Sequence, residues 1–92
     1  MATSSVLTHV ISFDLAVPYL EWRERFDAHA PVRERYGIQT LFCGKGVHDG
    51  VKICVILQAE PGVVDRFLQE EDAYLRAAGH RVESNIVQVV YS

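Results

Sequence analysis

The chain has 92 residues, a formal net charge of −3, and 49% apolar against 23% charged residues. This length predicts one domain, residues 1–92, and this composition is that of a globular protein and excludes a disordered one. Along residues 21–35 the arginines alternate with acidic residues, as on a solvated helix face, and no basic cluster follows. Nucleic acid is therefore not expected as a partner.

The N-terminal residues, the lengths of the apolar runs and the two cysteines indicate a cytoplasmic protein. The N-terminal residues lack the basic segment and long apolar core of a signal peptide, and no apolar run is long enough to cross a membrane. The cysteines, Cys43 and Cys54, have no CxxC spacing and are too few for a disulfide framework. We expect no membrane association and two reduced thiols.

The first half of the chain predicts a strand followed by a helix. Residues 6–13 alternate between two semi-apolar faces, as in a strand. Pro18 suits the first position of a helix, and Gly37 suits the residue just after its end. Between them, Pro31 disfavours helical geometry at the preceding residue, so we expect a kink or a restart there.

A hairpin and a second helix–strand unit follow. Residues 38–43 and 51–58 read as two strands around a turn containing Asp49-Gly50. A hairpin centred on His48 and Asp49 would place Cys43 opposite Cys54, as two buried thiols and not a disulfide. A helix opens near residues 59–62 and stops at Gly79, and residues 85–91 form the last strand. Glu71 lies within the apolar stripe of this helix, where it is expected to extend past the apolar surface to water.

The order of elements is β-α-β-β-α-β, which predicts an α+β ferredoxin-like fold with both helices on one face of a four-stranded antiparallel sheet. The other face should then be polar, yet residues 53–57 and 86–91 are apolar on both faces. Leaving several hundred Å² of such surface in water would cost on the order of 10 kcal/mol. We therefore expect a homodimer joined through this face, a dimeric α+β barrel.

The first helix also carries the candidate site. One face of it presents residues three and four apart, namely Tyr19, Trp22, Phe26, His29, Arg33 and Tyr36. In a pocket between helix and sheet, Trp22, Phe26 and Tyr36 would form aromatic walls. His29 would transfer a proton and Arg33 would hold a carboxylate or enolate, because histidine titrates near neutrality and arginine stays charged.

The competing interpretation is structural. The aromatic residues would then be core, His29 a partly exposed residue at a helix end, and Arg33 the ion-pair partner of Glu34 or another acid. His9, within the first strand, is expected to be buried and hydrogen-bonded, with ligand binding as its alternative role. A kink at Pro31 could also separate His29 from Arg33.

Other chemistry has little support. No histidine pair has the i,i+4 spacing of metal ligands, the glycines of residues 44–46 do not lie between a strand and a helix, and no base adjoins either cysteine. We therefore expect no metal and no cofactor.

A set of scattered positions resembles a known family. These are Trp22, Phe26, His29, Arg33, Gly37-Ile38, Gly44, Asp49, Gln58-Ala59-Glu60 and Gly79-His80. They resemble a small family of bacterial proteins of similar length, a domain of unknown function in the dimeric α+β barrel superfamily. The resemblance implies a pocket between helices and sheet. That superfamily includes cofactor-free monooxygenases, stress-responsive barrel proteins, lactone isomerases and haem-handling enzymes.

Two functions remain open from the sequence. The favoured one is the binding of a small organic molecule between helices and sheet. The alternative is a cofactor-independent enzyme of monooxygenase, isomerase or cyclase type, with His29 as acid/base and Arg33 as anion clamp.

Overall fold

The computed structural model describes residues 6–47 and 52–91, which form four strands and four short helices. In chain order these are β1 (Leu7–Leu15), α1 (Tyr19–Ala28), α2 (Ala30–Arg35), β2 (Gln39–Lys45), β3 (Ile53–Ala59), α3 (Val63–Glu70), α4 (Asp72–Ala77) and β4 (His80–Tyr91). Because α1 with α2 and α3 with α4 each replace one predicted helix, the predicted β-α-β-β-α-β order is confirmed.

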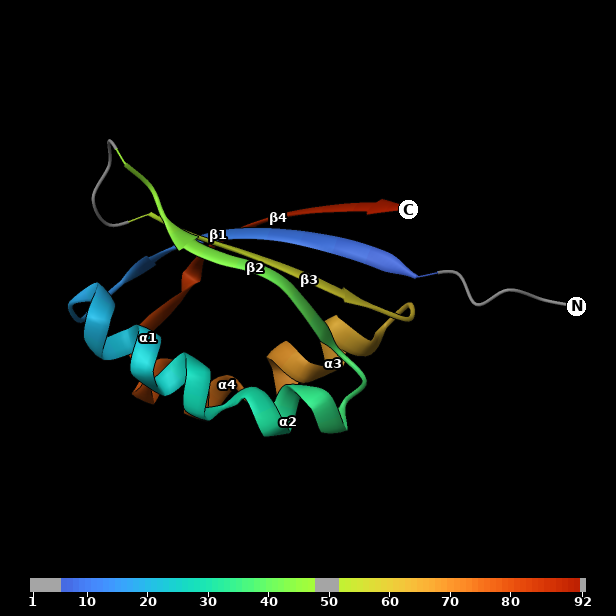
Figure 1. The fold of residues 1–92 in the computed structure, drawn as a ribbon, viewed down its shortest axis with the longest axis horizontal. Helices are drawn as coiled ribbons and strands as arrows, with labels where there is room; N and C mark the ends of the chain where they lie inside the picture. The colour runs from blue at the N-terminus through green and yellow to red at the C-terminus, as the bar shows by residue number, and fades with distance from the viewer. Residues whose placement is uncertain (1–5, 48–51, 92) are drawn as a thin grey trace, which may run out of the picture.

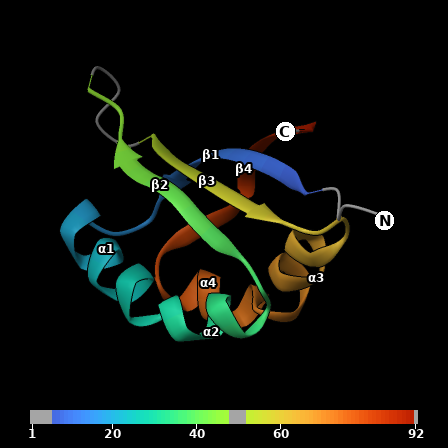
Figure 2. The same cartoon turned by 45° about the vertical axis from the view of Figure 1, so that its right-hand side comes forward.

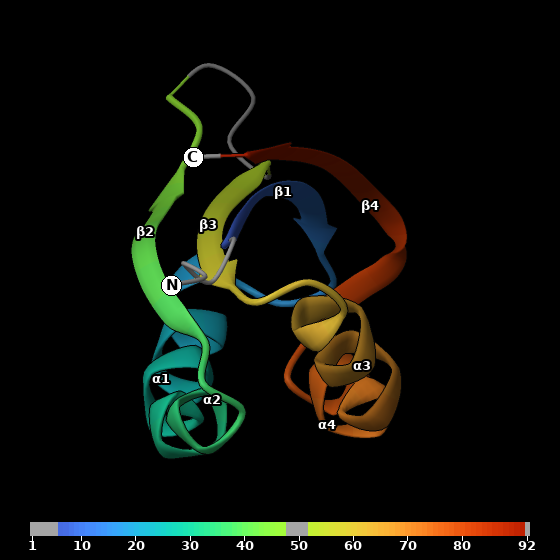
Figure 3. The same ribbon diagram turned by 90° about the vertical axis from the view of Figure 1, so that its right-hand side faces the viewer.

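The strands form one antiparallel sheet in the order β2-β3-β1-β4, and all helices lie on one of its faces (Figures 1 and 2). This is the ferredoxin-like α+β fold expected from the sequence. Viewed along the long axis, the sheet arches over two columns of helices, α1 with α2 and α3 with α4 (Figure 3). The core lies beneath this arch.

Both helical regions break once. The first breaks at His29, two residues before Pro31, whose ring lies in the first turn of α2. This is the predicted restart, because proline removes a backbone donor and clashes with the carbonyl four residues earlier. The second breaks at Glu71, where the sequence predicted one continuous helix. That prediction was wrong, because neither proline nor glycine marks the break.

The helical regions end where the sequence predicts. Gly37 and Gly79 have φ angles of 81° and 102°, a left-handed conformation that favours glycine. At Gly79 a side chain would also collide with the methyl groups of Val17, so only glycine fits. This close approach brings the end of α4 against the residues that follow β1.

Two details of the sheet differ from the predictions. The strand β4 begins at His80 and not at residue 85, because Arg81 and His80 resume pairing with Asp14 and Leu15 beyond a bulge in β4, where residues 82–85 lie opposite the single residue Phe13.

In the hairpin, Cys43 pairs with Val55, and Gly44 pairs with Cys54. The predicted pairing of the two cysteines was therefore wrong. An irregularity between Thr40 and Phe42 changes the register of β2 against β3. Both cysteines are free thiols, as predicted; the predicted turn centre, residues 48–49, lies outside the described part.

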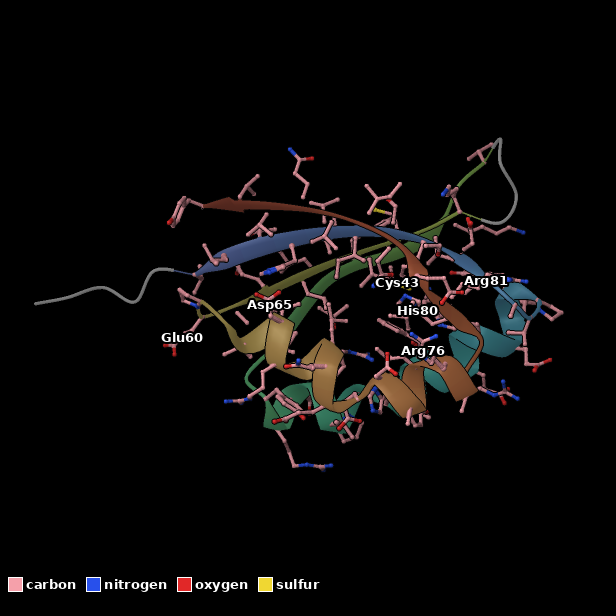
Figure 4. The ribbon with its side chains drawn as sticks, turned by 180° about the vertical axis from the view of Figure 1, so that it is seen from behind. Cys43, Glu60, Asp65, Arg76, His80 and Arg81 are labelled. Atoms are coloured by element: carbon pink, nitrogen blue, oxygen red, sulfur yellow. The ribbon has the colours of Figure 1, made fainter. Side chains whose placement is uncertain are left out.

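The core joins the sheet to both helix columns. Phe13, Ile53 and Val64 are fully buried, and Trp22 is 2% exposed. The Phe13 ring lies edge-on to Trp22, with centroids 5.6 Å apart, and stacks on the His80 ring at 3.6 Å. Phe13 therefore connects α1 to the start of β4, where His80 lies between the sheet and the helices (Figure 4).

The sheet face opposite the helices has no cover among the described elements (Figure 1). On β3 the inward Ile53, Val55 and Leu57 are buried, while the outward Cys54 and Ile56 are half-buried. On β4, residues 86–91 are exposed on both faces, apolar ones included. No described helix is long and apolar enough to cross a membrane.

The burial of His80 predicts a dependence of stability on pH. Burial lowers the pKa of His80 below its ordinary value of 6.5, although the hydrogen bond with Asn85 opposes this effect. The unfolded chain then binds more protons than the folded one just below pH 6.5. The stabilisation is complete above that pH and is lost as the pH falls through the folded pKa.

We expect urea denaturation between about pH 5 and pH 8 to show a free energy of unfolding that falls more on acidification in the wild type than in His80→Gln. Glutamine keeps a donor for Asn85 but does not titrate. Identical slopes for the two proteins would show that His80 is not the group responsible.

Candidate functional site

A partly open cavity of about 40 Å³ lies between the sheet and the helices. Its lining includes the predicted residues Trp22, Phe26, His29 and Arg33. The remaining residues of the lining are Ile11, Phe13, Val55, Leu57, Phe67, Leu68, Tyr74, Leu75, Ala78 and His80. The break before Pro31 thus does not separate His29 from Arg33, and both border one apolar space.

Two of the predicted aromatic walls serve the core and the cavity at once. The rings of Trp22 and Phe26 lie 4.9 Å apart, one turn along α1, and Trp22 also contacts Phe13 on β1. The packing favours these rings as a rigid wall, because each is held by other aromatic groups. The structural interpretation and the site interpretation of Trp22 are therefore both compatible with its position.

His29 is buried at the break between α1 and α2. Its Nε2 lies 2.9 Å from Oε1 of Glu71, and its ring stacks on Tyr74 with centroids 4.0 Å apart. At 5% exposure, it is not the partly exposed residue of the structural interpretation. No described residue hydrogen bonds its Nδ1, and that atom is not among the fully enclosed ones, so Nδ1 borders open space.

Glu71 is the residue that sequence reasoning missed. It lies at the break between α3 and α4 and holds the imidazole, where we expected a carboxylate that only reaches for water. Its presence in the apolar stripe of the predicted helix was the available signal. A carboxylate on one ring nitrogen fixes the orientation of the imidazole and stabilises it when it takes a proton.

Tyr36 does not line the cavity. Its hydroxyl donates to Oε1 of Glu70 at 2.6 Å and lies 3.5 Å from Oε2 of Glu71. The hydrogen bond to Glu70 is the main cause that raises the pKa of Tyr36 to about 12. Tyr36 therefore holds the carboxylates of Glu70 and Glu71 through its hydroxyl, and it does not form a wall of the cavity.

Arg33 is 4% exposed and has no carboxylate within 4.0 Å among the described residues. The predicted alternative, an ion pair with Glu34, is therefore not formed. Its Nε donates to Oγ1 of Thr40 at 3.1 Å and its Nη1 to the carbonyl oxygen of Phe26 at 2.9 Å. Its guanidinium carbon lies 3.8 Å from the centre of the Phe26 ring. Burial lowers the pKa of Arg33, and neutral acceptors alone hold the charge.

His9 lies away from the cavity lining, although β1 turns it toward the helices. It is 2% exposed, and its Nε2 is 4.0 Å from the carboxylate of Asp65. Its Nδ1 is fully enclosed without a partner in the described part of the chain, so the expected full hydrogen bonding is not observed. Asp65 lies on α3, away from His80 at the start of β4 (Figure 4).

His80 is a further ionisable residue of the cavity that sequence reasoning did not assign to the site. Its Nε2 lies 2.6 Å from Oδ1 of Asn85, within β4. The described residues contain no group of three or more His, Cys, Asp or Glu side chains placed to hold a metal ion. The ionisable groups at the cavity are thus two imidazoles, one guanidinium and the phenol of Tyr74, with the carboxylate of Glu71 behind His29.

The comparisons with known proteins show the family. No curated protein matches the sequence. One family model, described as a domain of unknown function, DUF3764, matches residues 6–92. This agrees with the resemblance of the scattered motif residues to such a family. The chain belongs to the DUF3764 family.

Proposed function

We propose that this protein binds a small organic molecule in the cavity between the helices and the sheet. The observation that supports this function is the pair of buried ionisable side chains, His29 and Arg33, at the edge of an apolar cavity with aromatic walls. Burying such groups costs free energy, and an apolar space with a few polar groups is the usual form of a ligand site.

A ligand must displace one wall, because about 40 Å³ is far below the roughly 150 Å³ of an apolar cavity that binds benzene. The helix α4 is the wall that costs least to move, since it has six residues and none is buried. Its Tyr74 donates to the carbonyl oxygen of Arg25 at 3.0 Å, which joins it to α1.

A surface hollow of about 330 Å³ lies outside this wall. Tyr74 and Ala78 line both this hollow and the cavity. Rotation of the Tyr74 ring with a small shift of α4 would therefore join the two spaces. Access from this side would bring a ligand directly past His29, on which the Tyr74 ring stacks.

The cavity is tested by filling it. Ala78 is buried at the cavity, so Ala78→Val removes free volume. Ala73→Val on α4 is the matched control, because Ala73 is exposed and lines neither the cavity nor the hollow. Titration of the labelled protein with phenol should shift the indole resonance of Trp22. We expect Ala78→Val to weaken binding by about tenfold or more and Ala73→Val to leave it unchanged. Equal affinities in all three proteins would place phenol elsewhere and contradict the function.

The alternative function is a cofactor-independent enzyme of isomerase, cyclase or monooxygenase type. The pairing of His29 with Glu71 favours it, because the carboxylate would accept the Nε2 proton and leave Nδ1 as the basic atom beside the cavity. His29 would remove a proton from carbon next to a carbonyl group, and the nearby charge of Arg33 would stabilise the resulting enolate.

The enzyme alternative predicts proton exchange. Phenylpyruvate in D₂O should exchange its methylene protons faster with the protein than without it. His29→Gln should reduce this acceleration about 100-fold or more, as for loss of a general base, and Glu71→Gln by less. An acceleration that survives in His29→Gln would exclude His29 as the base. If phenol binds but the protein does not accelerate exchange of the phenylpyruvate protons, only the binding function remains.

We further propose that the protein is a homodimer of the dimeric α+β barrel superfamily. The outward positions that pair along β1 between Thr8 and Ser12 carry no charge on any strand. These positions are Gln39, Phe42 and Gly44 on β2, Cys54, Ile56 and Gln58 on β3, Thr8, Val10 and Ser12 on β1, and Ile86, Gln88 and Val90 on β4. A broad uncharged face of this kind suits burial against a second copy.

Sedimentation of the wild type should give about twice the chain mass of 10.4 kDa. Ile86→Lys should shift the protein to the monomer, because Ile86 is 63% exposed in the single chain but would be buried in the dimer. Leu20→Lys is the control, since Leu20 is 79% exposed on α1, away from the sheet. A wild-type monomer at micromolar concentration would contradict the dimer.

A further inference from the structure

The guanidinium of Arg33 has one nitrogen that the fold does not use. Nε and Nη1 donate to Thr40 and to the carbonyl of Phe26, and Phe26 covers one face of the group. No described residue accepts a hydrogen bond from Nη2. Within the described residues, the one fully enclosed side-chain nitrogen or oxygen without a partner is Nδ1 of His9. Nη2 is therefore in contact with open space.

The covalent geometry of arginine tells which way Nη2 points. One N–H of Nη2 lies parallel to Nε–H on the same edge of the planar guanidinium, the edge that binds a carboxylate in a two-bond fork. Nε–H is directed at the hydroxyl of Thr40. The free donor consequently lies on the Thr40 side of the group and away from the carbonyl of Phe26, which binds Nη1.

That side of the guanidinium borders a surface hollow of about 440 Å³ between α2 and β2. Arg33 and Thr40 both line it, with Ala30, Glu34, Gly37, Ile38 and Gln39. Thr40 does not line the cavity, whereas Phe26 does. The guanidinium thus separates two spaces, and its free edge lies toward the outer one.

We propose that this hollow binds the carboxylate of a small organic acid, with Nη2 of Arg33 and the hydroxyl of Thr40 as the two donors. The Thr40 oxygen accepts from Nε and can still donate its own proton, so both donors converge on one anion. A buried cation without an acidic partner gains most from an anion that arrives with a ligand. The site shares Arg33 with the cavity of the proposed function, but it lies on the outer side of that residue and does not require a ligand in the cavity.

Glu34 sets a limit on the ligand. Glu34 lines the hollow, and its carboxylate does not pair with Arg33 within 4.0 Å. It would repel a second negative charge, so the hollow is suited to a monoanion and not to a phosphate or a dicarboxylate. Ala30, which also lines the hollow, has no polar side-chain group, and this favours an acid with an apolar body.

The test compares benzoate with benzamide, which has the same shape but no charge, by titration of the labelled full chain. Benzoate should shift the backbone resonances of residues 37–40 and bind about tenfold more tightly than benzamide. Arg33→Gln should abolish this preference. Thr40→Val should weaken benzoate several-fold, and Arg35→Gln, on the same helix but outside the hollow, should change nothing.

Two further variants keep the assignment falsifiable if Arg33→Gln does not fold. Glu34→Gln should tighten benzoate binding and leave benzamide unchanged. Ala78→Val, which fills the cavity, should leave benzoate unaffected. Equal binding of benzoate and benzamide, or no binding of either, would overturn the assignment. Weaker benzoate binding in Ala78→Val would also overturn it, because the anion would then lie in the cavity. Phenol binding tests the cavity separately from all of these outcomes.

Discussion

The hydrogen bond between His29 and Glu71 joins the two places where the helix layer is discontinuous. His29 ends α1 and begins α2, and Glu71 ends α3 and begins α4. The two columns of helices therefore meet through their breaks, at 2.9 Å, above the cavity. Tyr74 stacks on the same imidazole and donates to α1. The Phe67 ring of α3 adds an apolar contact between the columns, with its centroid 5.2 Å from that of Tyr36 at the end of α2. The position of each column under the sheet depends on these contacts.

A second constraint is the buried charge of Arg33. Burying a guanidinium to 4% exposure with only neutral acceptors lowers the free energy of unfolding. Stability alone would favour an apolar side chain or an acidic partner at this position. The face of the group packs on Phe26, which recovers part of the cost. The free edge provides no stability to the fold, and a ligand would supply the missing partner.

The sequence predicted what depends on local pattern. Alternation and helical spacing identified the strands and helical regions, and proline and glycine marked the first break and both helix ends. The apolar outward face followed from strands such as residues 53–57. The predictions that were wrong concern contacts between residues that are far apart in the chain. The irregular register of β2 displaced Cys43 from Cys54, and a bulge within β4 let this strand start at His80.

In the candidate site, too, the local pattern was predicted and the long-range contacts were not. His29 and Arg33 were found because one helix face carries both, and the break kept them beside one cavity. Glu71 lies 42 positions from His29 in the chain, so no local spacing could pair them. Tyr36 occupies the predicted stripe, yet the turn of α2 directs its hydroxyl to Glu70. A periodic pattern assigns a face of a helix, and the neighbouring column decides what that face contacts.

The strand β3 connects the two proposed surfaces of the molecule. Val55 and Leu57 line the cavity, while Cys54 and Ile56, which alternate with them, face outward. A partner seated on the outward face would hold β3 from behind and leave the sheet side of the cavity rigid. The adjustment needed to admit a ligand would then fall on α4, which has no buried residue. Dimer formation and ligand entry would thus act on opposite walls of the same cavity, one fixed by the partner and one free to move.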